Sequence, residues 1–424
     1  MSGPLLYYAI RQPGYAHPCA ALFATLLIER WDASYDAAPR SLRTWLVLGA
    51  AAGAAALARP QLAVWALLLP AAALDDVRRR GAQRLGRLAA RWAAAAAVGA
   101  AVFVPQLVAW KVVYGAWYVV PQGPGFLRWD APAWSETLFS SRNGLFPWAP
   151  LYAPMAIGVI ALARRGLRLP LALLLGLFGQ AIVNGAAWDW WAGGSFGGRR
   201  FDSCYAVFAV GAGVCIAAAL RALARRGVVR LVAGACLAAA ALIAIATAEL
   251  AARTSVNSAR IGGGEAASAV WRARIGGVRG RLAAALSSAA SAPVRAVFAW
   301  RHGIDLGAYD RLVGVHVLGD TYPGLNSYPD RLREPLPAPG AMTAPTMSVL
   351  VGLNRRGTVA LRVPVEGSGQ VAVTWNGGAT ATADIAGRGA VDLAGLAPLR
   401  EINTLEIRAP IGTMIGAIEI RAEP

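Results

Sequence analysis

Residues 188–201, WDWWAGGSFGGRRF, separate two long apolar runs, residues 169–187 and residues 202–220. Tryptophan is enriched where a membrane meets water, glycine lets a backbone come close to a ligand, and adjacent arginines can hold an anion such as a phosphate. The stretch therefore predicts a loop at a membrane surface that joins two membrane-spanning helices. Two interpretations stay open at this point: an interfacial loop with anchoring aromatic residues, or a binding site for an anion.

The composition of the whole chain indicates an integral membrane protein. Its 424 residues are 57% hydrophobic and 15% charged, with a mean hydropathy of +0.47. The net charge of +18 could indicate nucleic acid, but no basic helix or aromatic-basic platform of a known nucleic-acid-binding module occurs. Most arginines lie between apolar runs, so we expect no nucleic-acid partner and interpret the charge as a signal of membrane topology.

The apolar runs predict about eight membrane spans within residues 1–250, a polytopic α-helical domain. The predicted spans are residues 17–31, two short spans within 44–74 that turn at Arg59, and residues 92–110, 148–163, 169–187, 202–220 and 231–250. Residues 1–16 lack a basic segment and a cleavage site of a signal peptide, and their prolines predict a loop.

Arginine-dense loops alternate with arginine-poor ones along this domain. The dense loops, which we expect to be cytoplasmic, are residues 30–43, 75–91, 164–168 and 221–230. This assignment places residues 1–16, the loop 111–147, residues 188–201 and everything after residue 250 on the outer face.

The character of the sequence changes after residue 250. Residues 251–345 are predicted to be an extracytoplasmic connecting region with an amphipathic helix near residues 279–300. Residues 346–424 alternate between apolar and polar positions, with turns predicted at Asn376-Gly377 and at Gly387-Arg388-Gly389. This pattern predicts a small all-β domain, an antiparallel sandwich on the outer side of the membrane.

Charged residues beside the apolar runs are the first candidates for a site. Arg199 and Arg200 could neutralise a phosphate, with backbone amides of residues 193–198 as further donors. The structural alternative is that one of them pairs with Asp202 or extends to lipid headgroups.

Acidic residues and one histidine are weaker candidates. Asp189, between tryptophans, fits a general base or an ion-pair partner, and Asp130 and Glu136 are further acids in the loop before it. His17 begins a helix and is expected to cap it or to form a hydrogen bond. The four cysteines lie within or beside apolar runs, so neither a disulfide framework nor a metal site is predicted. No motif of a cofactor occurs.

Residues 138–150, LFSSRNGLFPWAP, together with residues 188–201 resemble bacterial membrane glycosyltransferases of the C superfamily. These enzymes are similar to protein O-mannosyltransferases and to the transferases that decorate lipid A. Residues 3–8, 14–17 and 57–60 resemble further segments, and the likeness covers about residues 1–250. It implies transfer of a sugar from a polyprenyl-phosphate carrier to a glycan, lipid or protein acceptor at the outer face of the bacterial cytoplasmic membrane.

The resemblance also implies roles for residues. The reaction would invert the anomeric carbon, with a carboxylate taking the acceptor's proton and cations stabilising the departing phosphate. Arg199 and Arg200 match the basic part of the motif, with Arg142 and Lys111 as helpers. The residues expected to line the substrate are Trp188, Trp190, Trp191, Tyr7, Tyr8, His17 and Asn143.

The chain departs from this pattern at its start. The catalytic acid of such enzymes lies in the first outer loop, after an N-terminal transmembrane helix, and this chain begins beyond that point. We therefore expect a truncated chain that needs a preceding part for catalysis, with Asp189 and Asp130 as the acids within it. Two alternatives are a noncatalytic component of envelope glycan assembly and a transporter or flippase of lipid-linked sugars.

Overall fold

A computed structural model gives the architecture of the chain. It describes residues 3–37, 39–80, 85–120, 126–127, 129, 132–141, 143–187, 190, 192, 196–253, 267–302, 317–318, 340–353, 358–398 and 401–423. The chain divides into two compact units. The first comprises residues 1–262 and 267–294, and the second comprises residues 263–266 and 295–424.

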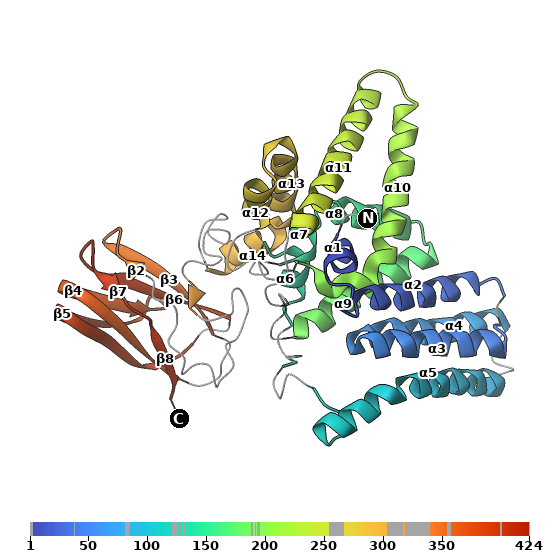
Figure 1. Ribbon diagram of the computed structural model, residues 1–424, viewed down its shortest axis with the longest axis horizontal. Coiled ribbons are helices and arrows are strands. Elements are labelled where there is room, and N and C mark those ends of the chain that lie inside the picture. Colours follow the sequence, from blue (N-terminus) through green and yellow to red (C-terminus); the bar gives the residue numbers. More distant parts are fainter. Residues whose placement is uncertain are drawn as a thin grey trace. The chain divides into compact units, whose positions relative to one another are not determined.

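The first unit is helical. Its helices are α1 (Pro4–Arg11), α2 (His17–Ala33), α3 (Leu42–Ala58), η1 (Pro60–Leu67), α4 (Leu68–Arg80), α5 (Leu85–Tyr114), α6 (Trp134–Phe139), α7 (Leu145–Trp148), α8 (Tyr152–Ala163), α9 (Arg168–Ala186), η3 (Arg199–Cys204), α10 (Tyr205–Leu223), α11 (Val228–Arg253), α12 (Ala267–Arg274) and α13 (Gly277–Ala290), followed by α14 (Ala292–His302), which continues into the second unit (Figure 1).

Several of these helices can cross a membrane. Among the described residues, five are long and apolar enough: Pro60–Arg79, Leu85–Tyr114, Arg168–Ala186, Arg199–Leu223 and Val228–Arg253. Two shorter apolar helices, Leu42–Ala58 and Tyr152–Ala163, accompany them. The prediction of a mostly helical chain with several apolar helices of membrane length is therefore confirmed.

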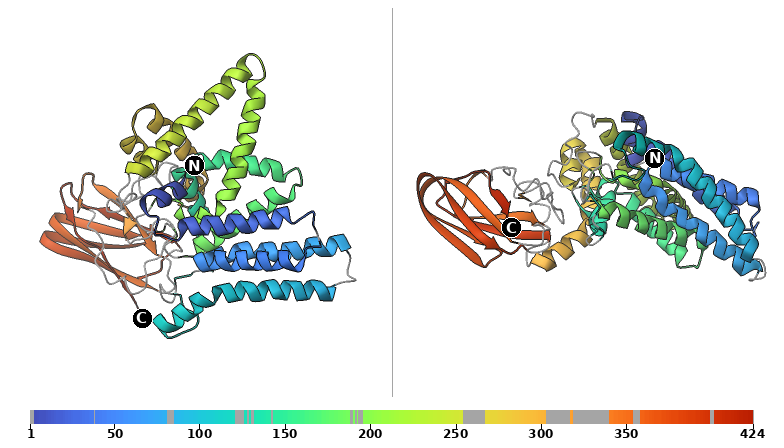
Figure 2. Two further views of the ribbon diagram at one scale, coloured as in Figure 1. Left: turned by 45° about the vertical axis from the view of Figure 1, so that its right-hand side comes forward. Right: turned by 90° about the horizontal axis from the view of Figure 1, so that it is seen from below.

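Helices α2, α3, α4 and α5 lie side by side in Figure 1 and in the left view of Figure 2. Small residues set the distance between α3 and α5. A Cβ atom at Gly49 would overlap the backbone of Ala95, and one at Gly53 would overlap the backbone of Gly99. In a membrane, lipid tails are as apolar as leucine, so such close backbone packing stabilises helix pairs.

The prediction of a loop over residues 1–16 is wrong for residues 4–11, which form α1. Pro4 stands in the first turn, where the missing N–H costs no helical hydrogen bond. Tyr7 and Tyr8 are buried against the rest of the unit, so tertiary packing stabilises a segment too short to be helical alone.

The amphipathic helix predicted near residues 279–300 is two helices. α13 ends at Ala290 and α14 begins at Ala292, with Ser291 between them. Pro293 occupies the first turn of α14, and proline within a continuous helix would remove a hydrogen bond.

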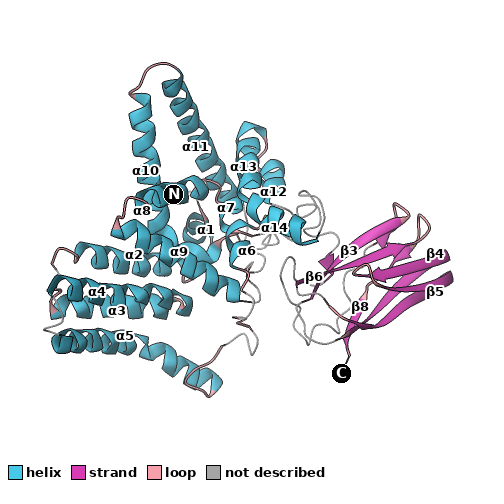
Figure 3. Ribbon diagram, turned by 180° about the vertical axis from the view of Figure 1, so that it is seen from behind, coloured by secondary structure: helices cyan, strands magenta, loops and turns pink. Residues whose placement is uncertain are grey.

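The strands belong to the second unit (Figure 3). They are β1 (Val317–Leu318), β2 (Gly340–Ala341), β3 (Thr346–Leu353), β4 (Val359–Trp375), β5 (Ala379–Leu396), β6 (Glu401–Arg408), β7 (Met414–Ile415) and β8 (Glu419–Ala422). They form a sheet of order β1-β3-β6-β4-β7-β2, with β5 and β8 also paired to β4. Alternate residues of β4, such as Val359, Leu361 and Val363, are buried, as the alternation in the sequence predicts.

One of the two predicted turns is confirmed and the other is wrong. Asn376 and Gly377 have φ values of 50° and 67° and join β4 to β5 in the left-handed conformation of a tight hairpin. Residues 387–389 lie inside β5 instead, where Gly387 pairs with Gly367 of β4. Two glycines opposite each other let a long hairpin continue where the sequence indicates a reversal.

Candidate functional site

His17, Arg59 and Asp202 form a cluster that comes from three distant parts of the chain. His17 is the first residue of α2, Arg59 lies between α3 and η1, and Asp202 belongs to η3. The Nδ1 atom of His17 is hydrogen-bonded to Oδ2 of Asp202. Arg59 Nη1 lies 3.0 Å from the same Nδ1 atom and 3.7 Å from Asp202 Oδ2. We name this group the His17–Arg59–Asp202 cluster.

Local sequence explains how Arg59 and Asp202 come to these positions. Pro60 disfavours helix at the residue before it, and Arg59 is extended, with φ −157° and ψ 120°. The chain turns at this residue, so the guanidinium group of Arg59 is directed away from α3. Gly198, with φ 73°, precedes η3 and turns the chain so that Asp202 enters the interior.

The cluster is largely closed to solvent. The side chains of Asp202 and His17 are 1% and 5% exposed, and that of Arg59 is 17% exposed. A buried carboxylate is stable only with charged or hydrogen-bonding partners, which Arg59 and His17 supply. Nδ1 of His17 lies between an acceptor, Asp202 Oδ2, and a donor, Arg59 Nη1, and the tautomer of the ring sets which of the two it bonds.

Positive charge dominates around this carboxylate. Burial lowers the pKa of Arg59 to about 10; Asp202 opposes this effect, and the nearby charges of Arg200 and Arg199 add to it. Arg59 therefore remains charged at neutral pH. Among the described residues, one carboxylate and two further guanidinium groups act on Arg59, an arrangement that favours the approach of an anion.

Arg199 and Arg200, the predicted phosphate residues, begin η3 and are half-buried. The backbone carbonyl of Arg200 accepts a hydrogen bond of 3.1 Å from Asn184 Nδ2 at the end of α9. The alternative that one of them pairs with Asp202 is not observed among the described contacts, because Asp202 pairs with His17 and Arg59.

Aromatic residues lie on or near the cluster, and two of them, Tyr7 and Tyr8, were predicted to line a site. The ring of Tyr8 stacks on His17 with a centroid distance of 3.9 Å. Tyr15 lies on the same imidazole at 6.0 Å. Tyr7 stacks on Phe196 at 5.5 Å. His17 begins a helix and forms a hydrogen bond, as the sequence predicts.

The loop 111–147 also reaches this region. The carbonyl of Asn143, a buried residue, accepts a hydrogen bond of 3.0 Å from Gly198 N. Trp190 is buried as well, with 3% exposure. Residues 1–16, the end of the loop 111–147 and the stretch 188–201 therefore meet, as we expected from the topology.

Two glycines of the stretch serve packing within the protein. A Cβ atom at Gly197 would overlap the indole ring of Trp148, and one at Gly198 would lie 3.0 Å from the Cα atom of Leu145. At both positions, the missing side chain therefore makes room for α7, and the prediction that these glycines allow approach to a ligand stays a prediction.

Other predicted residues lie elsewhere or outside the description. Lys111 Nζ donates a hydrogen bond of 2.8 Å to the carbonyl of Gly115 on an exposed part of α5, and no described contact joins it to the cluster. The candidates Asp130, Arg142, Trp188, Asp189 and Trp191 lie outside the described residues.

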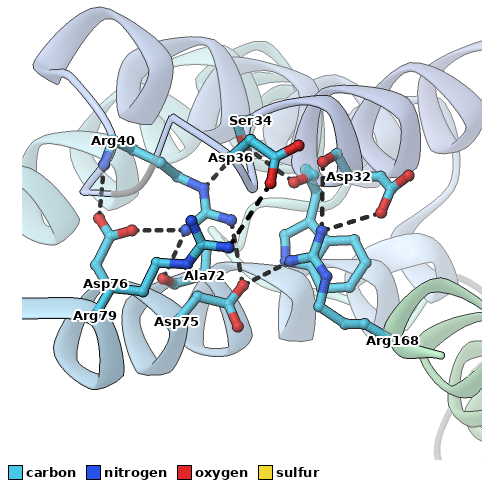
Figure 4. Close-up of polar contacts among 10 residues, drawn as sticks. Asp32, Ser34, Asp36, Arg40, Ala72, Asp75, Asp76, Arg79 and Arg168 are labelled. Atoms are coloured by element: carbon cyan, nitrogen blue, oxygen red, sulfur yellow. Dashed lines mark hydrogen bonds and ion pairs between the residues drawn. The ribbon is translucent and has the colours of Figure 1, made fainter. Parts of the chain in front are cut away.

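A second polar group lies at the opposite end of α2 (Figure 4). Arg40, which is fully buried, donates to Asp76 Oδ1 at 2.7 Å and to Asp75 Oδ2 at 3.2 Å. Arg168 donates to Asp75 Oδ2 at 2.6 Å and to Asp32 Oδ1 at 3.0 Å. We name these five residues the Arg40–Arg168 network.

The two groups lie at opposite ends of α2. His17 and Asp32 are at the two ends of α2, and 15 intervals of 1.5 Å place them about 22 Å apart along the axis. Buried residues between them include Ala24, Leu27 and Ile28. Polar groups are thus concentrated at both ends of an apolar helical layer. The residues of the network come from the arginine-dense segments that we expect to be cytoplasmic.

Sequence reasoning did not select Arg59 or Asp202 as site residues. Both border apolar runs, and ionisable residues at membrane depth tend to be functional, so this position was a usable signal. What the sequence could not show is that residues 17, 59 and 202 converge. Their pairing depends on how α2, α3 and η3 pack.

The described residues contain no group of three or more His, Cys, Asp or Glu side chains that could hold a metal ion. Comparison of the chain with models of protein families, with curated proteins and with solved structures finds no match. The functional argument therefore rests on the arrangement of the residues themselves: arginines around a buried carboxylate–imidazole pair, at one end of a set of apolar helices.

Proposed function

We propose that the chain binds the phosphate of a polyprenyl-phosphate sugar at Arg59, Arg199 and Arg200 and takes part in transferring the sugar to an acceptor. One observation carries this proposal: the guanidinium group of Arg59 is fixed beside a buried carboxylate, and the charges of Arg199 and Arg200 act on it. Arginine suits phosphate because its planar fork of donors matches two phosphate oxygens.

Each part of the cluster has a role in this proposal. Arg199 and Arg200, at the border of the apolar helices, take the phosphate charge that develops as the carrier leaves. Asp202 is buried and engaged by two partners, so it acts as a positioning residue that holds Arg59 and His17. In the transfer, an acceptor hydroxyl forms a bond to the anomeric carbon. The bond from that carbon to the phosphate oxygen breaks, and the hydroxyl proton passes to a carboxylate.

The proposal includes a topology that goes beyond the five long helices. Eight crossings place the His17–Arg59–Asp202 cluster on the outer face of a bacterial cytoplasmic membrane and the Arg40–Arg168 network on the inner face. The β-rich unit, as a sandwich, then lies on the outer side. This assignment follows the arginine distribution and agrees with polar groups at both ends of α2.

The test compares sugar transfer in membranes that contain the chain or its variants. Native membranes, which hold carriers and acceptors, are incubated with radiolabelled nucleotide sugars, and label is followed from the solvent-extractable lipid to the insoluble product. We expect Arg199→Ala with Arg200→Ala to abolish this passage while the protein still inserts. The control removes the same charge from the exposed pair Arg225 and Arg226. Undiminished transfer in the first variant would contradict the assignment of Arg199 and Arg200 as phosphate-binding residues.

A further inference from the structure

A cavity lies beside the Arg40–Arg168 network, at the end of the helices opposite to the His17–Arg59–Asp202 cluster. Its volume is about 370 Å³. It lies among the start of α3, the end of α4 and the start of α5, and its lining includes Ser41, Thr44, Asp76, Arg87, Leu88 and Arg91. Apart from Asp76, none of these residues belongs to the cluster or the network described above.

The charge of this cavity is positive. Asp76 is its acidic residue, but Arg40 neutralises it through a side-chain hydrogen bond of 2.7 Å to Oδ1 and a backbone one of 3.0 Å to Oδ2. Arg87 and Arg91 stand one turn apart on α5, and neither has a carboxylate partner among the residues that the structure describes. Two guanidinium groups therefore remain for an external anion.

One of these arginines is held in place. Arg91 Nη1 donates a hydrogen bond of 2.7 Å to the backbone carbonyl of Arg40, which is itself anchored in the network. Arg87 is exposed and free of described hydrogen bonds. The cavity thus combines a cation that is held in place with an exposed one that has no described hydrogen bond, and both are available to a bound anion.

Two hydroxyl groups also line the cavity. Ser41 caps α3 by accepting a hydrogen bond of 3.2 Å from Thr44 N, and the hydroxyl groups of the two residues are 3.0 Å apart. The N-terminal end of α3 adds partial positive charge near these hydroxyl groups. Phosphate oxygens would therefore meet both arginines and hydroxyl groups in this cavity.

The surroundings favour a lipid as the source of the phosphate. The cavity is lined at its edge by Leu85 and Leu88, and Leu85 is 51% exposed. These residues begin α5, whose membrane-length window is only 6% buried within the protein. Acyl chains can lie along α5 while the headgroup enters the cavity, an arrangement found in basic pockets between transmembrane helices.

We propose that this cavity binds the phosphate headgroup of an anionic phospholipid from the adjoining leaflet, with Arg87 and Arg91 as its cationic ligands. The bound lipid would link α3 to α5 at the end where the arginine-dense segments gather. This inference does not depend on the proposed sugar transfer, because the two sites are at opposite ends of the helices.

The test is native mass spectrometry of the full chain in detergent, titrated with phosphatidylglycerol and, separately, with phosphatidylcholine. We expect phosphatidylglycerol to bind preferentially, and Arg87→Ala with Arg91→Ala to weaken it by about tenfold or more, because charge-assisted contacts to phosphate are lost. Arg87→Ala alone leaves the contact between Arg91 and Arg40 intact and should still weaken binding measurably. This single variant keeps the test decisive where the double variant fails to fold.

The control variant, Arg225→Ala with Arg226→Ala, removes equal charge from exposed positions and should bind phosphatidylglycerol as the parent does. Equal losses in both double variants would contradict a specific site, and so would unchanged binding in Arg87→Ala. Glycerol phosphate is added as a competitor. If it displaces the lipid at millimolar concentration, the cavity takes a soluble phosphate compound and the proposed lipid source is wrong.

Discussion

Replacing Arg40 by methionine should destabilise the helical unit, because Arg40 is the centre of the Arg40–Arg168 network. Its side chain is fully buried. It donates hydrogen bonds to Ser34 Oγ at 2.8 Å, to the carbonyl of Ala72 at 2.9 Å, and to Asp75 and Asp76. Methionine keeps much of the apolar volume but supplies no donor, so these acceptors lose a partner together.

The magnitude follows from what remains after the substitution. Removing one member of a buried ion pair costs about 3–5 kcal/mol. Asp75 keeps Arg168 at 2.6 Å, and Asp76 keeps the backbone N–H of residue 40 at 3.0 Å. We therefore expect the lower end, about 3 kcal/mol. For a unit of this size, that corresponds to a fall of about 6–12 °C in the unfolding midpoint.

The assay is thermal unfolding of the purified chain in detergent, followed by tryptophan fluorescence at one fixed scan rate, since irreversible unfolding makes the midpoint depend on that rate. Arg30→Met is the matched control, because Arg30 is 58% exposed and, among the described residues, pairs with its neighbour Glu29 alone. The double variant Arg40→Met with Asp76→Leu should recover part of the loss. A shift for Arg40→Met no larger than that of the control would refute a buried network at this position.

Three further predictions concern packing, the site and topology. Gly53→Leu should cost about 1–3 kcal/mol by forcing α3 from α5, whereas Gly86→Leu, with open space at its Cβ position, should be nearly neutral in the same unfolding assay. Asp202→Asn should lower stability by about 1.5–3 kcal/mol because Arg59 loses its buried charged partner, while the exposed Asp392→Asn should stay within about 0.5 kcal/mol. A cysteine at position 225 in a cysteine-free background should resist a membrane-impermeant maleimide added to intact cells, and labelling there would reverse the proposed topology.

Much of the helical architecture could be predicted from the sequence, because an apolar run of membrane length has few stable conformations other than a helix. Helix α1 could not, because Leu5, Leu6, Tyr7 and Tyr8 form too short a run, and the burial of its tyrosines depends on distant residues. The same limit applies to the long β hairpin. The glycines near residue 387 predict a turn locally, but pairing with β4 keeps them within β5, even though Gly387 has a φ of 91°.

The candidate site could be predicted only in part. The basic pair at residues 199 and 200 stands out in the sequence, and its neighbourhood with Tyr8, His17 and Asn143 follows from placing the outer segments on one face. The central pairing of Arg59 with Asp202 joins positions 143 residues apart, and no local pattern encodes it. Arg199 and Arg200 lie close to Asp202 in the sequence and suggested an ion pair between neighbours. In the structure, the carboxylate of Asp202 instead pairs with Arg59 and His17, which are distant in the sequence.

The most direct test of the account is whether the arginines beside the His17–Arg59–Asp202 cluster recognise the phosphate of a polyprenyl carrier. The full chain in lipid nanodiscs is titrated with undecaprenyl phosphate and with undecaprenol, which lacks the phosphate. We predict clear preference for the phosphate, reduced about tenfold or more in Arg199→Ala, because a lost charge-assisted hydrogen bond is worth about 1.5–3 kcal/mol. The preference should be unchanged in Arg225→Ala. Equal binding of the two lipids by the parent chain, or an undiminished preference in Arg199→Ala, would contradict the account.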